Sequence, residues 1–292
     1  MIITKHTMDV IHRDWEGSIK YRFLQIPKGK TRLTMLSYGN DDASMVYLNN
    51  KMKACRRIGI PYAHVWRPTI HGDDVIKYDI SKYCEDGHHS VMVQMPLPSD
   101  KHNIDDIVNS IPITSDVDGM NPQNPYVIAP VANGVRQIIN RLNRVNIECI
   151  TNIEIYPGDI ALVIGRSRWV GQPIAKMLSD DYDFTVVQAN SNTTERELAS
   201  MVSMAKVIVS CAGQRGIIND EMVKEVPPRG RSLIVDVGTN RDDNGKLCGD
   251  VTLSDSSPLL VTPVPGGVGP MTVLGLMDNV VRLANVNREK EI

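Results

Sequence analysis

A glycine- and proline-rich segment, residues 262–272, constrains the fold more than any other part of the chain. It reads Thr-Pro-Val-Pro-Gly-Gly-Val-Gly-Pro-Met-Thr and is flanked by apolar segments on both sides. Proline fixes φ and lacks a backbone N–H, so the run should neither continue a helix nor form a central strand. Glycine allows a ligand to approach the bare backbone. We expect a rigid, shaped loop within a folded domain, with an ordinary surface turn as the alternative.

The composition indicates a globular protein with one large domain or two of ordinary size, because the chain has 292 residues, 42% of them hydrophobic and 23% charged. A net charge of −2 gives no general attraction to nucleic acid or membranes. No apolar run approaches the roughly 18 residues of a membrane span, and the first residues lack the apolar core of a signal peptide. We therefore expect a cytoplasmic protein that binds neither nucleic acid nor membrane. The cysteines and histidines lack metal-ligand spacing, so we expect no metal site.

Strand-like and helix-like segments alternate along both halves of the chain. The first half has strand patterns at 32–37, 64–66 and 90–95, and helical patterns at 42–58 and 103–110. The second half has short, fully apolar strand patterns at 159–164, 184–187, 207–211 and 232–237, with helical patterns at 195–204 and 273–285. Strands that alternate with helices predict an α/β protein with a doubly wound parallel sheet.

A possible dinucleotide site follows the strand at 159–164. Gly165 and Gly171 frame a turn before the next helix, although five residues separate them and the pattern is not GxGxxG. Gly213 and Gly238 each follow a later strand, at the edge where parallel sheets bind ligands. No acidic residue follows the strand at 184–187. Arg166 and Ser191 could instead bind a 2′-phosphate, which favours NADP over NAD; a solvated surface arginine is the alternative for Arg166.

Candidates for proton transfer lie in the first half. Tyr47 and Lys51 are one turn apart on the helix at 42–58, where a partly buried lysine could act as a base near neutral pH. Gln94 ends a strand, and Asp116 and Asp118 lie in a turn-like stretch. The structural alternatives are a solvated lysine beside a packed tyrosine, an amide that satisfies a turn, and Asx turns.

Seven segments in this order resemble the bifunctional methylenetetrahydrofolate dehydrogenase/cyclohydrolase family, from about residue 32 to the C-terminus. The matching segments are Tyr47-x3-Lys51, Val-Gln-Met-Pro-Leu-Pro at 93–98, Asp-Val-Asp-Gly at 116–119, Gly-Arg-Ser-x-x-Val-Gly-x-Pro at 165–173, Asp-Val-Gly at 236–238, Gly-Asp-Val at 249–251 and the loop 262–272.

The resemblance implies a two-domain α/β subunit with a cleft between the domains, usually a homodimer. Residues 1–120, joined by a C-terminal helix at 272–292, would form the folate-binding catalytic domain, and residues 121–271 a Rossmann-like dinucleotide-binding domain. The implied reactions belong to one-carbon metabolism, with a link to purine biosynthesis. They are oxidation of 5,10-methylene-tetrahydrofolate to the methenyl form with NADP or NAD, and hydrolysis to 10-formyl-tetrahydrofolate.

The resemblance also implies roles for individual residues. Lys51 would handle the proton of the hydrolysis, Gln94 would hydrogen-bond Lys51, Tyr47 would position the folate, and Asp118 would bind the pterin. The remaining folate contacts would be Val93, Met95, Pro265, Gly266, Gly267, Val268 and Gly269. The dinucleotide contacts would be Gly165, Arg166, Ser167, Ser191, Gly213, Gly238 and Thr239.

The chain departs from the family pattern at three places. Ser115 replaces a lysine before Asp-Val-Asp-Gly, residues 129–134 replace a Pro-Cys-Thr-Pro-x-Gly segment, and Asn190 replaces a histidine. Three alternatives therefore accompany the bifunctional enzyme. They are a dehydrogenase without hydrolysis, a folate- or nucleotide-binding homologue with reduced turnover and, if the resemblance is set aside, an NAD-linked dehydrogenase of a small acid.

Overall fold

The computed structural model describes residues 3–39, 42–69, 72–84, 89–98, 101–144, 153–225, 232–257 and 259–290. The chain forms two compact units. The five-stranded unit comprises Met1–Asp14 and Val131–Thr272, and the three-stranded unit comprises Trp15–Pro130 and Val273–Ile292. The divisions fall within helices α1 (Lys5–Phe23) and α9 (Val268–Lys290) and at the start of α5 (Pro130–Arg144).

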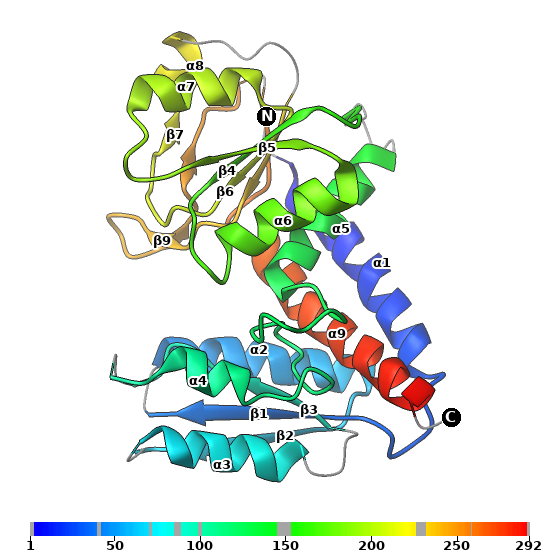
Figure 1. The fold of residues 1–292 in the computed structure, drawn as a ribbon. Helices are drawn as coiled ribbons and strands as arrows, with labels where there is room; N and C mark the ends of the chain where they lie inside the picture. The colour runs from blue at the N-terminus through cyan, green and yellow to red at the C-terminus, as the bar shows by residue number, and fades with distance from the viewer. Residues whose placement is uncertain are drawn as a thin grey trace. The chain divides into compact units, whose positions relative to one another are not determined.

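The three-stranded unit is built on a small parallel sheet. Its strands are β1 (Arg32–Tyr38), β2 (Tyr62–Arg67) and β3 (His89–Val93), in the order β2-β1-β3. Helices α2 (Asp42–Ile58) and α3 (Asp73–Cys84) connect the strands and lie on opposite sides of the sheet (Figure 1). The short helix α4 (Ile104–Asn109) follows β3.

Apolar packing and one buried ion pair hold α3 against this sheet. Leu36 and Val93 pack with Ile76 and Ile80 in one buried cluster. Asp79 of α3 is fully buried and accepts two hydrogen bonds of 2.6 Å from the Arg67 guanidinium at the end of β2. A buried carboxylate is tolerated when it is paired in this way.

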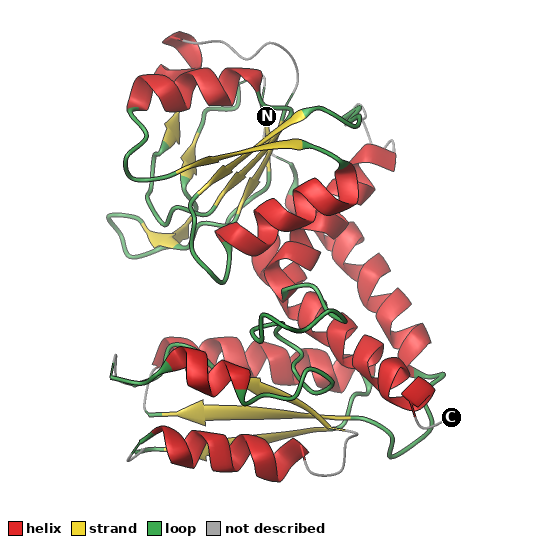
Figure 2. Cartoon of the chain, in the orientation of Figure 1, coloured by secondary structure: helices red, strands yellow, loops and turns green. Residues whose placement is uncertain are grey.

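The five-stranded unit has a parallel sheet in the order β12-β8-β6-β4-β5. Helices cover both of its faces (Figure 2), so the expected doubly wound α/β fold is confirmed. Its strands are β4 (Ile160–Ile164), β5 (Thr185–Ala189), β6 (Val207–Ser210), β8 (Leu233–Asp236) and β12 (Leu260–Val261). Two short pairs form separate two-stranded sheets in the same unit: β7 (Ile218–Asn219) with β11 (Val251–Thr252), and β9 (Asn240–Arg241) with β10 (Leu247–Cys248).

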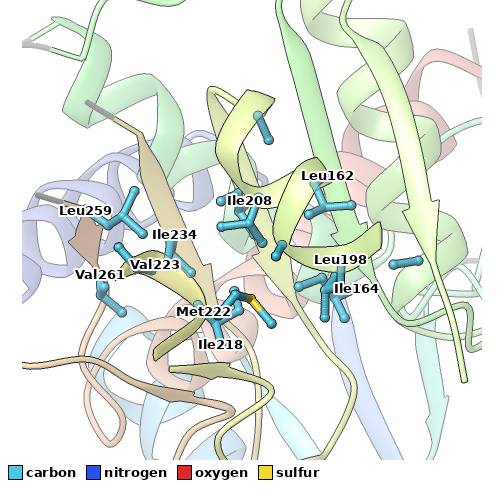
Figure 3. Close-up of a cluster of buried hydrophobic side chains, with 14 residues drawn as sticks. Leu162, Ile164, Leu198, Ile208, Ile218, Met222, Val223, Ile234, Leu259 and Val261 are labelled. Carbon is cyan, nitrogen blue, oxygen red and sulfur yellow. The ribbon is translucent and has the colours of Figure 1, made fainter. Parts of the chain in front are cut away.

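Successive residues along each strand point to opposite faces of this sheet. Leu162, Ile208 and Ile234 pack in one buried cluster with Leu198 of α7 (Glu195–Met204) and Met222 of α8 (Asp220–Glu225) (Figure 3). The intervening valines 163, 209 and 235 are also fully buried and face the side of α6 (Gly171–Tyr182). Both faces are apolar because both are covered, which is typical of parallel sheets.

Hydrogen bonds at its first turn explain where helix α7 begins. Thr194 and Glu197 form a capping box at the start of α7, where each side chain accepts a hydrogen bond from the other's backbone N–H. This helix occupies residues 195–204, as predicted, and α2 occupies 42–58, as predicted.

The start of α9 differs from the prediction. We expected a loop through residue 272 and a helix from residue 273, but α9 begins at Val268. Pro270 is therefore its third residue, a position where the missing N–H has no helical partner to lose. Residues 291 and 292 of the expected helix lie outside the described residues.

Within the described part of the chain, no helix combines the length and apolarity needed to cross a membrane.

Candidate functional site

Lys51 of α2 and Gln94, at the end of β3, meet in the three-stranded unit. Lys51 Nζ donates a hydrogen bond of 3.0 Å to Gln94 Oε1, and Gln94 Nε2 donates one of 2.6 Å to the carbonyl of Met95. The Gln94 backbone N–H donates to the Leu36 carbonyl of β1 at 2.8 Å. Because the amide nitrogen and the backbone of Gln94 are both engaged, its side-chain oxygen is held toward Lys51.

Charge interactions link Lys51 to Asp118. Burial lowers the pKa of Lys51, and the carboxylate of Asp118 opposes this by raising it. Burial also raises the pKa of Asp118, and the Lys51 ammonium opposes that change. The structure therefore brings Lys51, Gln94 and Asp118 together. Tyr47 lies one turn before Lys51 on α2, with 47% of its surface exposed.

The loop that carries Asp118 is organised by Asp116. Asp116 is fully buried, and its side chain accepts hydrogen bonds from the backbone N–H groups of Met120 at 3.2 Å and Asn121 at 2.8 Å. The carbonyl of Ser115 accepts a 2.8 Å hydrogen bond from the Val91 N–H of β3. Asp116 thus shapes a turn, while Asp118 is left to face Lys51.

The expected dinucleotide residues of the five-stranded unit follow four of its strands. Gly165 directly follows β4, Ser191 lies two residues after β5, Gly213 three residues after β6, and Gly238 two residues after β8. These strands are parallel, so their carboxyl ends lie at one edge of the sheet. That edge is where open α/β sheets bind ligands.

The turn between β4 and α6 requires its two glycines. Gly165 has φ +119°, and a Cβ there would lie 2.6 Å from the carbonyl oxygen of Cys211. A Cβ on Gly171 would lie 2.3 Å from the carbonyl oxygen of Gly165. The five residues between the two glycines therefore form a turn in which Gly171 packs against the backbone of Gly165.

Ser167 accepts hydrogen bonds from the first two N–H groups of α6. The N–H of Gly171 donates to Ser167 Oγ at 3.3 Å, and that of Gln172 donates to the Ser167 carbonyl at 3.0 Å. Arg166 is exposed and forms no ion pair within the described ranges. In this turn the N–H groups of Gly171 and Gln172 are engaged, while the Arg166 side chain is exposed.

Two buried carboxylates, which sequence analysis noted only as parts of motifs, hold the next loops in place. Asp250 accepts hydrogen bonds from the N–H groups of Ala212 at 2.8 Å and Gln214 at 3.0 Å, and from Ser210 Oγ at 2.9 Å. Asp236 accepts from Gly238 N–H at 2.9 Å and from the N–H of Asp250 itself at 3.0 Å. For Asp236, the sequence signal was an acidic residue at the end of an apolar strand.

This arrangement limits how Gly213 and Gly238 can contact a ligand. The Gly213 N–H also donates to Asp250, at 3.3 Å. The N–H of each glycine is therefore already engaged by a carboxylate, and only Gly213 has open space on its Cα side. Thr239 is exposed beside Gly238.

Comparisons with known proteins match both halves of the chain. The family models "Tetrahydrofolate dehydrogenase/cyclohydrolase, catalytic domain" and "Tetrahydrofolate dehydrogenase/cyclohydrolase, NAD(P)-binding domain" match residues 6–118 and 129–288. The bifunctional protein FolD of Streptococcus pyogenes (strain Manfredo) is 34% identical over 265 residues, or 86% of each chain.

The chain belongs to the tetrahydrofolate dehydrogenase/cyclohydrolase family.

Solved structures share the whole fold. The bifunctional enzyme FolD from Campylobacter jejuni is 28% identical, with a TM-score of 0.80 over 98% of this chain and 99% of that one. A methylenetetrahydrofolate dehydrogenase from the silkworm Bombyx mori is 26% identical, with a TM-score of 0.80 over 98% and 97%.

These matches confirm the family, the fold class and the enzyme class that the sequence predicted. The chain is a dehydrogenase and cyclohydrolase of one-carbon metabolism that acts on a tetrahydrofolate derivative with a nicotinamide dinucleotide. Lys51, Gln94 and Asp118 fall in or at the end of the catalytic-domain match, and the Gly165–Gly171 turn falls in the NAD(P)-binding match.

We predict that Asp250→Asn weakens binding of the dinucleotide roughly tenfold or more. Asparagine offers one acceptor oxygen where several donors converge, and each buried donor left unpaired costs about 1–3 kcal/mol. Fluorescence titration with NADPH measures the change. The cyclohydrolase rate, which needs no dinucleotide, should stay within about twofold of the parent, since a water-dependent step gains nothing from this loop.

Asp243→Asn is the matched control, because Asp243 lies in the same unit with its side chain 94% exposed. The prediction is wrong if Asp250→Asn binds NADPH as tightly as Asp243→Asn does.

Proposed function

We propose that Lys51, Gln94 and Asp118 perform the folate chemistry of this enzyme, and that its cofactor is NADP rather than NAD. The hydrogen bond between Lys51 and Gln94, with Asp118 nearby, is the observation that carries the proposal. In the oxidation, the methylene carbon of 5,10-methylene-tetrahydrofolate gives a hydride to the nicotinamide and becomes a methenyl cation. In the hydrolysis, water adds to that carbon, a C–N bond breaks and a proton is released.

Lys51 is suited to accept that proton. Burial favours its neutral amine, and only the neutral amine has a lone pair that can take a proton from the attacking water. Gln94 accepts an N–H of the lysine, so the lone pair points away from Gln94. The reacting carbon is already electrophilic, so the reaction needs proton removal and positioning rather than activation of the carbon.

Asp118 is suited to bind the pterin ring. The amino group and ring N–H of a pterin form a paired donor edge, to which one carboxylate can make two charge-assisted hydrogen bonds. Its loop is anchored by Asp116 and by β3, so the carboxylate is positioned before substrate binds. Tyr47, Val93, Met95 and residues 265–269 complete the proposed folate contacts.

The preference for NADP rests on Arg166. Its exposed guanidinium lies in the turn after β4, and no acidic residue follows β5 to repel a 2′-phosphate. Ser191 is exposed after β5 and would contribute a hydroxyl. Gly165, Ser167, Gly213, Gly238 and Thr239 would contact the rest of the dinucleotide.

We also propose that the enzyme is a cytoplasmic homodimer and that its product feeds purine biosynthesis. Family resemblance supports these points.

We predict that Lys51→Met lowers the cyclohydrolase rate by roughly 10²–10⁴-fold, the usual contribution of a general base. The loss of the methenyl chromophore measures this rate. Lys53→Met is the control, because Lys53 lies on the same helix and is exposed. If Lys51→Met hydrolyses the methenyl compound within twofold of Lys53→Met, the role of Lys51 is refuted.

We predict that Asp118→Asn moves the acid limb of the cyclohydrolase kcat/KM profile to lower pH. The rate should rise as Lys51 loses its proton, and the Asp118 carboxylate raises the pKa of Lys51. Removing that charge lowers the pKa, so the neutral amine persists at lower pH. The folate KM should rise roughly tenfold as well. An acid limb that stays in place, or moves upward, would contradict the charge coupling.

We predict that Arg166→Ala lowers kcat/KM with NADP roughly tenfold or more and leaves that with NAD within about twofold. Reduced-cofactor absorbance with each dinucleotide measures both values. Arg196→Ala, an exposed position on α7, serves as the control for general effects of lost charge. A parent enzyme that prefers NAD would refute the phosphate contact.

A further inference from the structure

Asn279 links helix α9 to the loop between α4 and α5. It is 1% exposed, and its side-chain Nδ2 donates hydrogen bonds of 2.7 Å to the Val117 carbonyl and 2.8 Å to the Ile128 carbonyl. The two N–H groups of one amide nitrogen therefore clamp two points of the same loop, which lies against α9 in Figure 1. Asn279 belongs to the same three-stranded unit as Lys51, Gln94 and Asp118.

We propose that Asn279 is a positioning residue that sets the place of the Asp118 carboxylate. The carbonyl of Val117 belongs to the peptide group that joins Val117 to Asp118, so a bond to it fixes the residue that would bind the pterin. This inference rests on the proposed function, because it assigns Asp118 to the folate.

The loop around Asp118 is held from three directions. Ser115 is bonded to β3, and Asp116 holds the backbone of Met120 and Asn121. The first anchor comes from strand β3 and the second from within the loop, and neither of these hydrogen bonds is made to the peptide group between Val117 and Asp118. Asn279 of α9, 162 residues along the chain from Val117, bonds that peptide group directly.

Loss of the Asn279 hydrogen bonds should displace Asp118. Val117 is fully buried, so its carbonyl would be left without a partner and the loop would shift to satisfy it. A carboxylate that makes two parallel hydrogen bonds to a flat ring depends strongly on its direction. A small displacement of Asp118 would therefore weaken folate binding before it weakens the fold.

The test compares Asn279→Ala with Asn287→Ala. Asn287 lies on the same helix and donates a 3.1 Å hydrogen bond to the Thr114 carbonyl, four residues before Asp118. We expect Asn279→Ala to raise the folate KM of the cyclohydrolase roughly three- to tenfold and Asn287→Ala to change it by less than about twofold. NADPH affinity, measured by fluorescence titration, should be unchanged in both variants.

Two further measurements separate positioning from a general loss of structure. Asn279→Ala should move the acid limb of the kcat/KM profile in the same direction as Asp118→Asn, toward lower pH, because the carboxylate is withdrawn from Lys51. In the double variant Asn279→Ala/Asp118→Asn, the folate KM should be no higher than in Asp118→Asn alone, since the two changes act through one group.

The inference is wrong if Asn279→Ala melts at a lower temperature but keeps the parent's folate KM and acid limb, or if the two KM effects multiply independently. If Asn279→Ala does not fold, Asn279→Ser, which keeps a hydroxyl donor, is tested against the same expectations. A parent enzyme that neither oxidises the methylene compound nor hydrolyses the methenyl compound would instead refute the proposed function itself.

Discussion

Buried aspartates that accept backbone N–H groups hold the loops of both candidate sites. Asp116 organises the loop of Asp118 in the three-stranded unit. Asp250 gathers the N–H groups of residues 212–214 at the end of β6, and Asp236 binds the N–H of Asp250 in turn. Loops at the ends of parallel strands have N–H groups that no neighbouring strand satisfies. A carboxylate can accept several of them at once, so one side chain fixes a whole turn.

The ionisation of Asp116 and Asp236 is balanced between two opposing effects. Burial raises the pKa of Asp116 and of Asp236 to about 6, while the hydrogen bonds that each carboxylate accepts lower it. The hydrogen bonds thus favour the ionised form, which has the acceptor capacity that the loops use. Gly213, whose N–H donates to Asp250, is open on its Cα side, whereas Gly238, whose N–H donates to Asp236, is buried against Asp250.

Patterns within one segment were enough to predict much of the fold. The helical patterns at residues 42–58 and 195–204 predicted α2 and α7 with the observed bounds. Helix α1 was not predicted, although Met8, Ile11, Trp15 and Ile19 recur at helical spacing and are all buried. The predicted end of the loop 262–272 was too late, because glycine and proline are tolerated in the first turn of a helix, where no N–H has a helical partner.

Contacts between distant segments could not be predicted in this way. Nothing near Asn279 in the sequence indicates the carbonyl that lies 162 residues away, and nothing near Asp250 indicates the loop 38 residues before it. Family motifs identified Lys51, Gln94 and Asp118 as a set, but the residues that hold them belong to no local pattern. For that reason the supporting hydrogen bonds came only from the structure.

The partial burial of Lys51 also suits the charge of the substrate. A methenyl-tetrahydrofolate carries a positive charge at the reacting centre, so a permanently charged ammonium beside it would oppose binding. Burial makes the neutral amine more accessible near neutral pH, and it is the neutral amine that can accept a proton. The Asp118 carboxylate has the opposite effect, because it raises the pKa of Lys51 and favours the ammonium. Its own charge would be satisfied by the pterin donors once substrate binds, which would weaken its hold on the lysine proton. Substrate binding would thus favour the neutral base at the step that requires it, with no change in the protein beyond the pairing of one carboxylate.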